Sequence, residues 1–337
     1  GAGLARHLTA LGHQVIEVIR PNRQLRRLSG KSDPLDAYAA ARTALTESNQ
    51  PTPKSGDGAI EQIRYLFTAR KSAIKARTAA QVQIKSLLVT APTLLRERFR
   101  AMADAALITS LADFDIRPYP EHQGVVIALR ALARRHRYIT AEIHSLDQEL
   151  NTLTEHTNPA LIAASGVGSV TAAQLLITAG DNPDRLRSEA AFAALCGVSP
   201  IPASSGKTSR HRLNRGGDRH ANSALHRIAL VRMSHDARTK AYVEKKRAEG
   251  KGNKEIIRCL KRAIAREVFT LLTKNVEVPR VDDLRPFRKA LGVTLQQAAA
   301  HFNVWATKIS RIERELTRDD EFTLAYREWL ETTAPQN

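Results

Sequence analysis

The stretch VVIALRALARRHRYITAEIHSLDQELNTL, residues 125–153, decides the fold class of this chain. Its apolar side chains recur every three or four residues and therefore line one face of a helix. Residues 60–88 carry a similar pattern, and the two segments together predict an antiparallel helical hairpin. The apolar residues on this face form a stripe that could also pair the hairpin with another subunit, and this alternative stays open. The stripe consists of Ile139, Ile143, Leu146, Leu150 and Leu153.

The N-terminal part has a different pattern. Residues 4–11 predict a short amphipathic helix, residues 15–19 a buried strand, and residues 30–37 (GKSDPLDA) the start of an alanine-rich helix that reaches about Leu45. The order helix, strand, helix is typical of an α/β domain, here of its second half only. Residues 49–58 are rich in Pro, Gly and Ser and predict a linker.

The remaining boundaries follow from helix breakers and changes of composition. Asn158-Pro159 ends the second long helix, and residues 276–279 (VEVP) begin a linker. We expect a mainly α-helical chain with these parts: an α/β part at 1–48, a linker at 49–58, a helical hairpin or coiled coil at 59–157, a basic helical domain at 158–275, a linker at 276–283 and a last helical unit at 284–337.

The chain is strongly basic. It has 52 Lys and Arg against 34 Asp and Glu, a formal charge of +18, which favours nucleic acid as the partner. Residues 205–274 contain 19 basic and 6 acidic residues and so carry most of that excess. An aromatic content of 5% argues against a protein that stacks single-stranded bases.

Two cysteines, Cys196 and Cys259, have no metal-ligand or disulfide spacing, which favours a reducing cytoplasm. The sequence has no apolar run long enough for a membrane span and no signal-peptide pattern at its start. We therefore expect a cytoplasmic protein.

Two carboxylates mark the start of the alanine-rich helix. Asp33 and Asp36 are spaced i, i+3 and so project to the same side. Paired carboxylates are ligands for Mg²⁺, which phosphoryl chemistry commonly uses. In the structural alternative, Asp33 caps the helix before Pro34 and Asp36 interacts with the helix dipole.

The stretch SGVGSVTAA, residues 165–173, contains a Gly-x-Gly turn that opens a helix. The backbone N–H groups of such a turn, at Gly166 and Gly168, can bind a DNA phosphate without reading the base sequence. The turn resembles the hairpin of helix-hairpin-helix modules. A tight turn between packed helices explains the two glycines equally well.

The stretch GVSPIPASSGKTSRHRLNRGGDR, residues 197–219, is the strongest candidate for chemistry. Ser205 precedes a glycine, which leaves room for its hydroxyl to reach a substrate. A hydroxyl needs a base to attack phosphorus, and His211, His220 or a metal-bound group could serve. Without such help, this is a basic binding loop. The cations that would hold a phosphodiester and its transition state are Lys207, Arg210, Arg212, Arg215 and Arg219.

The last unit resembles a repressor-type helix-turn-helix. Residues 284–291 predict one helix, residues 294–297 (TLQQ) a capping box, and residues 306–314 a recognition helix. Trp305 stands where such modules place a small capping residue. The candidate DNA-contacting side chains of the recognition helix are Thr307, Lys308, Ser310 and Arg311.

Taken together, these stretches resemble a family of insertion-sequence transposases, the bridge-RNA-guided recombinases. That family combines an N-terminal RuvC-like DEDD domain with a C-terminal domain bearing a catalytic serine. The resemblance covers residues 1–275 and rests on residues 1–45, 165–173 and 192–222. It implies a partial α/β, RuvC- or RNase H-like part at residues 1–48, with a helix-turn-helix appended at the C-terminus.

The resemblance also implies roles for individual residues. Asp33 and Asp36 become the last two acidic ligands of a Mg²⁺-binding DEDD set. Ser205 becomes the nucleophile that attacks double-stranded DNA, with Ser204 as the alternative one position earlier. Family members assemble as homo-oligomers around a structured guide RNA, so that base pairing supplies most of the sequence specificity.

The first Asp and the Glu of the family's acidic set lie upstream of the segment that matches Gly1–Leu4 and are absent from this chain. We therefore expect a fragment of a complete transposase or a decayed copy of one. The rival to a DNA recombinase is a catalytically incomplete DNA-binding remnant or repressor. In-frame sequence upstream of Gly1 would decide between them.

Overall fold

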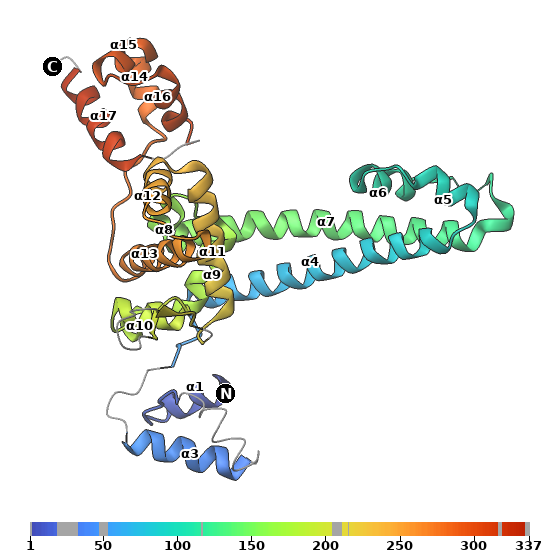
Figure 1. The fold of residues 1–337 in the computed structure, drawn as a ribbon, viewed down its shortest axis with the longest axis horizontal. Helices are drawn as coiled ribbons and strands as arrows, with labels where there is room; N and C mark the ends of the chain where they lie inside the picture. The colour runs from blue at the N-terminus through green and yellow to red at the C-terminus, as the bar shows by residue number, and fades with distance from the viewer. Residues whose placement is uncertain are drawn as a thin grey trace. The chain divides into compact units, whose positions relative to one another are not determined.

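The computed structural model describes residues 2–18, 33–46, 53–115, 117–203, 211–214, 216–315 and 319–333, and it is mostly helical (Figure 1). The expectation of a mainly α protein is therefore confirmed. The chain divides into one compact unit of residues 56–157 and a second formed by residues 1–55 with 158–337.

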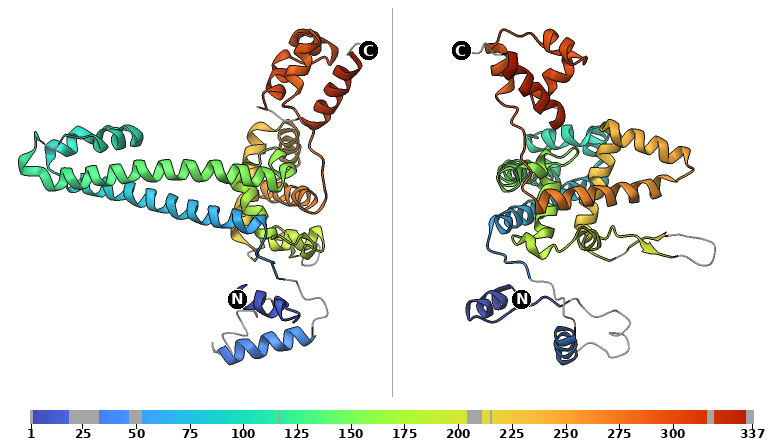
Figure 2. Two further views of the ribbon diagram at one scale, coloured as in Figure 1. Left: turned by 180° about the vertical axis from the view of Figure 1, so that it is seen from behind. Right: turned by 90° about the vertical axis from the view of Figure 1, so that its left-hand side faces the viewer.

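Two long helices form the first unit. They are α4 (Ala59–Thr90) and α7 (Gln123–Thr157), and they lie side by side along their length (Figures 1 and 2). Of the predicted stripe, Ile139, Ile143 and Leu150 are buried, while Leu146 and Leu153 are half-buried. Arg70 of α4 and Asp147 of α7 add an ion pair between the helices.

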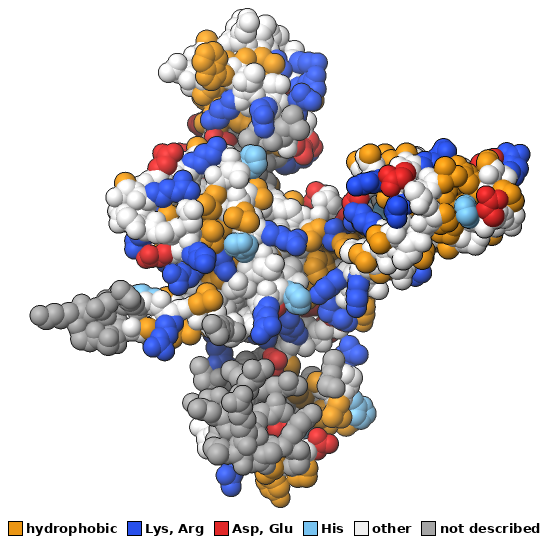
Figure 3. All heavy atoms as spheres, turned by 45° about the vertical axis from the view of Figure 1, so that its right-hand side comes forward, with side chains coloured by type: hydrophobic (Ala, Val, Ile, Leu, Met, Phe, Trp, Pro, Cys, Tyr) orange, Lys and Arg blue, Asp and Glu red, His pale blue; other side chains and the backbone are white. Residues whose placement is uncertain are grey.

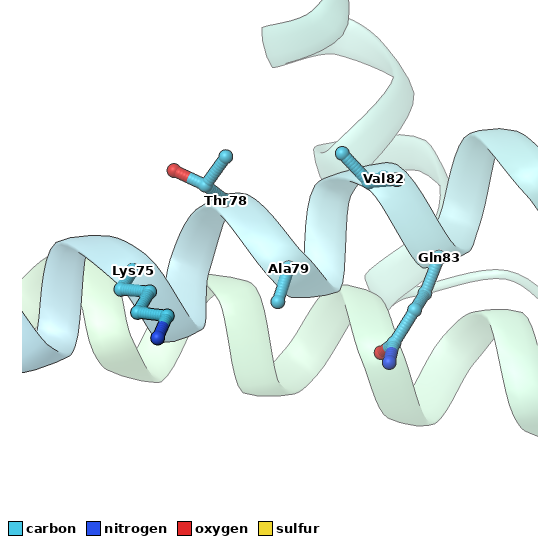
Figure 4. Close-up of a pocket in the computed structure, with 5 residues that line it drawn as sticks. All are labelled: Lys75, Thr78, Ala79, Val82 and Gln83. Carbon is cyan, nitrogen blue, oxygen red and sulfur yellow. The ribbon is translucent and has the colours of Figure 1, made fainter.

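A small core not expected from the sequence closes the far end of this pair. It is built by α5 (Thr93–Phe99), α6 (Asp104–Ala112) and the 3-10 turn η1 (Pro120–His122), which connect the long helices. Phe99 and Phe114 meet edge to face, with ring centroids 5.1 Å apart. Elsewhere α4 exposes a shallow groove, where Val82 is 61% exposed (Figure 4).

The N-terminal part contains α1 (Ala2–Ala10) and α3 (Asp33–Thr46). The strand expected at residues 15–19 is not formed where the structure describes it, because residues 13–18 are irregular. A strand needs a neighbour to satisfy its backbone N–H and C=O groups. Among the described residues, only the two short strands β1 (Ile201–Pro202) and β2 (His211–Arg212) pair with each other.

Four short helices form the C-terminal part: α14 (Leu284–Ala290), α15 (Leu295–His301), α16 (Ala306–Glu313) and α17 (Asp320–Thr333). The predicted capping box is present, since Thr294 accepts from the N–H of Gln297 and the Gln297 side chain accepts from the N–H of Thr294. Trp305 precedes α16 without a side-chain cap and is 85% exposed.

A buried ion pair ties this C-terminal part together. Arg288 of α14 and Glu313 of α16 are 5% and 7% exposed, and two hydrogen bonds of 2.6 and 3.0 Å join them. The Tyr326 hydroxyl of α17 donates to the same Glu313 carboxylate at 2.8 Å. One carboxylate thus connects three helices in the interior.

Replacing Glu313 by Gln is expected to destabilise this part by about 3–5 kcal/mol, because it leaves the Arg288 charge buried without a counter-ion. The double variant Arg288→Met/Glu313→Leu removes both charges, and its free energy of unfolding is expected to be close to that of the wild type. Denaturant unfolding followed by tryptophan fluorescence measures this part selectively, since Trp305 and Trp329 are the only tryptophans in the chain. Equal losses in the single and double variants would contradict the pairing.

Candidate functional site

Six helices build the basic domain that follows the long helices. α11 lies at its centre and contacts α9, α12 and α13, with Leu225 and Ile228 fully buried. Lys and Arg side chains spread over its surface, whereas Asp and Glu are sparse (Figure 3). The helices are α8 (Pro159–Ala163), α9 (Ser169–Ala179), α10 (Glu189–Leu195), α11 (Arg219–His235), α12 (Ala237–Ala248) and α13 (Asn253–Thr273), with the 3-10 turn η2 (Pro183–Arg185) before α10.

A two-stranded hairpin lies between α10 and α11. β1 (Ile201–Pro202) pairs antiparallel with β2 (His211–Arg212) (Figure 2). In this pairing Ile201 is opposite Arg212. The strands flank residues 203–210 in the sequence. The predicted nucleophile Ser205 and its alternative Ser204 lie outside the described residues, as do Lys207, Arg210 and Arg215. Their roles remain predictions.

Two glycines bring the ends of this segment together. Gly197 follows α10 and Gly217 precedes α11, both with positive φ (+64° and +78°). A Cβ on Gly217 would lie 2.6 Å from the Gly197 nitrogen and 2.6 Å from the Leu195 carbonyl oxygen. Only glycine permits this backbone approach. The contact therefore fixes where the hairpin leaves the helices.

Asp218, next to this contact, caps α11. Its carboxylate accepts from the backbone N–H of His220 at 2.7 Å and from the Thr178 hydroxyl at 2.8 Å. Burial favours the neutral acid, but these hydrogen bonds outweigh it and hold the pKa of Asp218 below its ordinary value. The nearby Cys196 thiol is buried, and burial followed by the Asp218 charge raises its pKa to about 12. Cys196 is therefore no nucleophile at neutral pH.

Asn222 and Lys261 support the turn from the other side. The Asn222 side-chain amide donates to the carbonyl oxygens of Cys196 and Gly197, both at 3.0 Å. The Lys261 ammonium, on α13, donates to the Asn222 side-chain oxygen at 2.6 Å. Lys261 is only 8% exposed. No local sequence pattern marks either residue, because the contact joins positions 39 residues apart.

A cleft of about 670 Å³ separates the hairpin from α13. β2 contributes His211 and Arg212 to one wall, and α13 contributes most of the other. The acidic groups near it are already paired, Glu255 with Lys251 and Glu189 with Arg262 and Arg266. Six cations line the cleft: Arg212, Lys251, Arg258, Lys261, Arg262 and Arg266. Its chemistry suits a polyanion.

The Gly-x-Gly turn connects α8 to α9. Gly166 has φ +73° and packs against α11, where a Cβ would lie 3.3 Å from the Ile228 carbonyl oxygen. Gly168 is exposed and caps the start of α9, and its N–H donates to the Thr171 hydroxyl at 3.0 Å. The helix-packing role of Gly166 is thus present in the structure. Phosphate binding at the two glycines remains a prediction.

The other predicted residues lie in separate elements. Asp33 and Asp36 are in the first turn of α3, exposed and half-buried. Among the described residues, no cluster of three or more His, Cys, Asp or Glu has the arrangement of a metal site. Arg219 is exposed at the first position of α11. On α16, Thr307 and Arg311 are exposed, whereas Lys308 pairs with Asp319 at 2.9 Å.

Part of this domain is similar to a known protein family. Residues 159–244 match the family model described as "Transposase IS116/IS110/IS902 family". The chain is 27% identical over 241 residues to the transposase for insertion sequence element IS1328 of Yersinia enterocolitica, covering 68% of this chain and 67% of that protein. None of the described helices is long and apolar enough to span a membrane.

Two further relatives are insertion-element proteins. The IS110 uncharacterized 43.6 kDa protein of Streptomyces coelicolor is 31% identical over 150 residues, 43% of this chain and 36% of that protein. The IS900 uncharacterized 42 kDa protein of Mycobacterium paratuberculosis is 24% identical over 239 residues, which cover 67% of this chain and 59% of that protein. The matches thus span about one third to two thirds of the relatives, and they relate the chain to insertion-sequence transposases of the IS110/IS116/IS902 family.

Replacing Gly217 by Ala is expected to destabilise the basic domain by more than the roughly 1–2 kcal/mol of a positive φ alone, because the new methyl group meets fixed backbone. Gly250→Ala supplies the φ effect without the clash, since φ is +78° there and the space is open. Gly252→Ala has neither constraint. Hydrogen exchange of peptides from α10 and α11 in the full chain measures the difference. Equal protection in all three variants would refute the close approach.

Proposed function

We propose that this chain, which carries a domain of the IS116/IS110/IS902 transposase family, binds double-stranded DNA and breaks and rejoins it during transposition. The observation that carries the proposal is the cation-lined cleft beside the β1–β2 hairpin, within and next to the matched residues 159–244. The glycine contact and the Asn222 bonds hold the hairpin at the mouth of this cleft.

The charge of the cleft supports binding to the DNA backbone. Arg212 and Arg258 are exposed, and among the described residues neither forms an ion pair with a carboxylate. Arginine binds phosphate oxygens in a bidentate fashion, and each neutralised phosphate releases counter-ions. Binding of this kind is largely independent of sequence. Base-specific recognition then has to come from elsewhere.

Ser205 is our candidate nucleophile. Its Oγ forms a bond to a DNA phosphorus while one bridging P–O bond of the backbone breaks. The hydroxyl proton passes to a base, for which His211 on the cleft wall is the candidate, and the departing sugar oxygen takes up a proton. The phosphodiester is conserved as a phosphoserine ester, so that the reverse attack by a sugar hydroxyl rejoins a strand without an energy source.

Asp33 and Asp36 would hold Mg²⁺. Two carboxylates one helical turn apart fit an ion that keeps several waters and also binds substrate phosphates. When bound, Mg²⁺ would neutralise charge that develops on a phosphate. The two residues alone form a partial site. Other acidic groups of a complete transposase would have to complete it.

Further partners follow from the same proposal. A structured guide RNA would supply sequence specificity, and the excess of 13 positive charges in residues 205–274 suits two nucleic acids as well as one. A homo-oligomer could form through the exposed groove of α4 around Val82 (Figure 4). Thr307 and Arg311 on α16 would contact DNA at element ends.

A second candidate function is a catalytically incomplete DNA-binding protein that occupies element ends. It is favoured by the cation-lined cleft, which suits a DNA backbone whether or not a strand is then broken. Both candidates predict DNA binding by the cleft. Only the first predicts a covalent intermediate.

Replacing Ser205 by Ala is expected to reduce a covalent protein–DNA adduct by roughly 10³-fold or more, because the attacking oxygen is gone. The assay incubates the chain with RNA transcribed from its insertion sequence and labelled element-end DNA, followed by denaturing electrophoresis. Ser204→Ala is the matched control. An adduct that survives Ser205→Ala would exclude this nucleophile, and one lost only with Ser204→Ala would move the assignment by one residue. DNA binding without any adduct would favour the second candidate.

In a complete transposase that contains this chain, replacing Asp36 by Asn is expected to abolish Mg²⁺-dependent strand joining while leaving DNA affinity within about twofold, because the amide is a poor ligand for this ion. Joining at increasing Mg²⁺ concentrations, with filter binding in parallel, measures the two effects separately. Glu61→Gln, which removes a carboxylate in the first turn of α4, serves as a control. Unchanged joining in Asp36→Asn would assign both aspartates to the helix start alone.

A further inference from the structure

Lys261 is a buried cation, and no carboxylate in the described part of the chain forms an ion pair with it. Among the described residues its ammonium has one hydrogen-bond acceptor, the side-chain oxygen of Asn222 at 2.6 Å. That acceptor is neutral, while an ammonium group has three donors. At 8% exposure, Lys261 has little access to bulk water. The side chain nevertheless lines the cleft between the hairpin and α13.

The surrounding acidic groups do not compensate this charge. Glu189 pairs with Arg262 and Arg266, and Glu255 pairs with Lys251. A buried charge is costly unless it is paired, and burial lowers the pKa of Lys261 accordingly. An anion that enters the cleft would remove this cost. The site is therefore built to gain from an anionic ligand.

Asn222 sets where this ammonium lies. Its amide is held by the carbonyl oxygens of Cys196 and Gly197, which belong to the turn that begins the hairpin segment. The amide orientation leaves the Asn222 oxygen facing Lys261. The position of the charge is thus tied to the backbone that also carries the candidate catalytic loop.

We propose that Lys261 binds a phosphate group of a nucleic-acid backbone in the cleft between the β1–β2 hairpin and α13, with Asn222 as its positioning residue. The proposal rests on the proposed function for the identity of the ligand as nucleic acid. It goes beyond that function by assigning the contact to a buried residue, whereas exposed cations alone would explain general attraction. Lys261 would gain its counter-ion only in the complex.

The test measures binding of a fluorescent 30-base-pair DNA duplex to the full chain by anisotropy at increasing KCl. Lys261→Met and Lys261→Gln remove the charge, and the Gln side chain keeps a donor for Asn222. In both variants, the slope of log affinity against log salt concentration is expected to become less steep by about one, which is the contribution of one phosphate contact. Binding is expected to weaken several-fold. The melting temperature of Lys261→Gln should equal or exceed the wild-type value, because an uncompensated buried charge is gone while the Gln amide still donates to Asn222.

Lys254→Met is the matched control. Lys254 lies on the same helix, is exposed and does not line the cleft, so its neutralisation should leave the slope close to that of the wild type. A wild-type slope in both Lys261 variants would overturn the proposal. Loss of folding in both would overturn it too, because the protein itself and not a ligand would then need the ammonium.

Failure of this inference can be told apart from failure of the proposed function. Ser205→Ala should lack the adduct and keep the wild-type salt slope. If no adduct forms in any protein, the proposed strand breakage fails while the slope difference at Lys261 still stands. If adducts form and the Lys261 variants bind like the wild type, only the present inference fails.

Discussion

The close approach of Gly197 and Gly217 is the constraint on which the rest of the candidate site depends. Their backbones come within a distance that no Cβ allows, so the end of α10 and the start of α11 are joined at one point. Asp218 then caps α11, and Asn222 one turn later reaches back to the carbonyl groups of Cys196 and Gly197. The paired strands β1 and β2 lie between these two glycines in the sequence.

Some basic side chains of the basic domain form ion pairs that connect its helices, and others line the cleft or lie on exposed helix faces. Arg232 forms two hydrogen bonds with Glu267 and donates to the Ser165 carbonyl oxygen, which connects α11 to α13 and to the Gly-x-Gly turn. Other acidic residues of the domain are paired in the same way, Glu189 with Arg262 and Glu255 with Lys251. The excess of positive charge consequently remains on the cleft and the exposed helix faces, where nucleic acid can reach it.

Sequence patterns predicted the long helices well, because apolar residues that recur every three or four positions lie on one face of a helix. They also predicted the Thr294–Gln297 capping box, which depends on residues three positions apart. The strand expected at residues 15–19 was wrong over residues 15–18, since an apolar run does not supply the neighbouring strand that it needs. The small core around Phe99 and Phe114 was missed because its residues carry no long repeat.

The sequence by itself determined the helical class and the concentration of positive charge in residues 205–274. It also singled out Ser205, Asp33 and Asp36 as candidates, and their roles remain predictions. Each of these depends on composition or on residues close together in the chain. Only the tertiary structure decided that Lys261 is buried against Asn222, that Gly217 meets Gly197 and that β2 faces α13 across a cleft. These contacts join residues 20 to 60 positions apart, and the packing of α10, α11 and α13 alone brings them together.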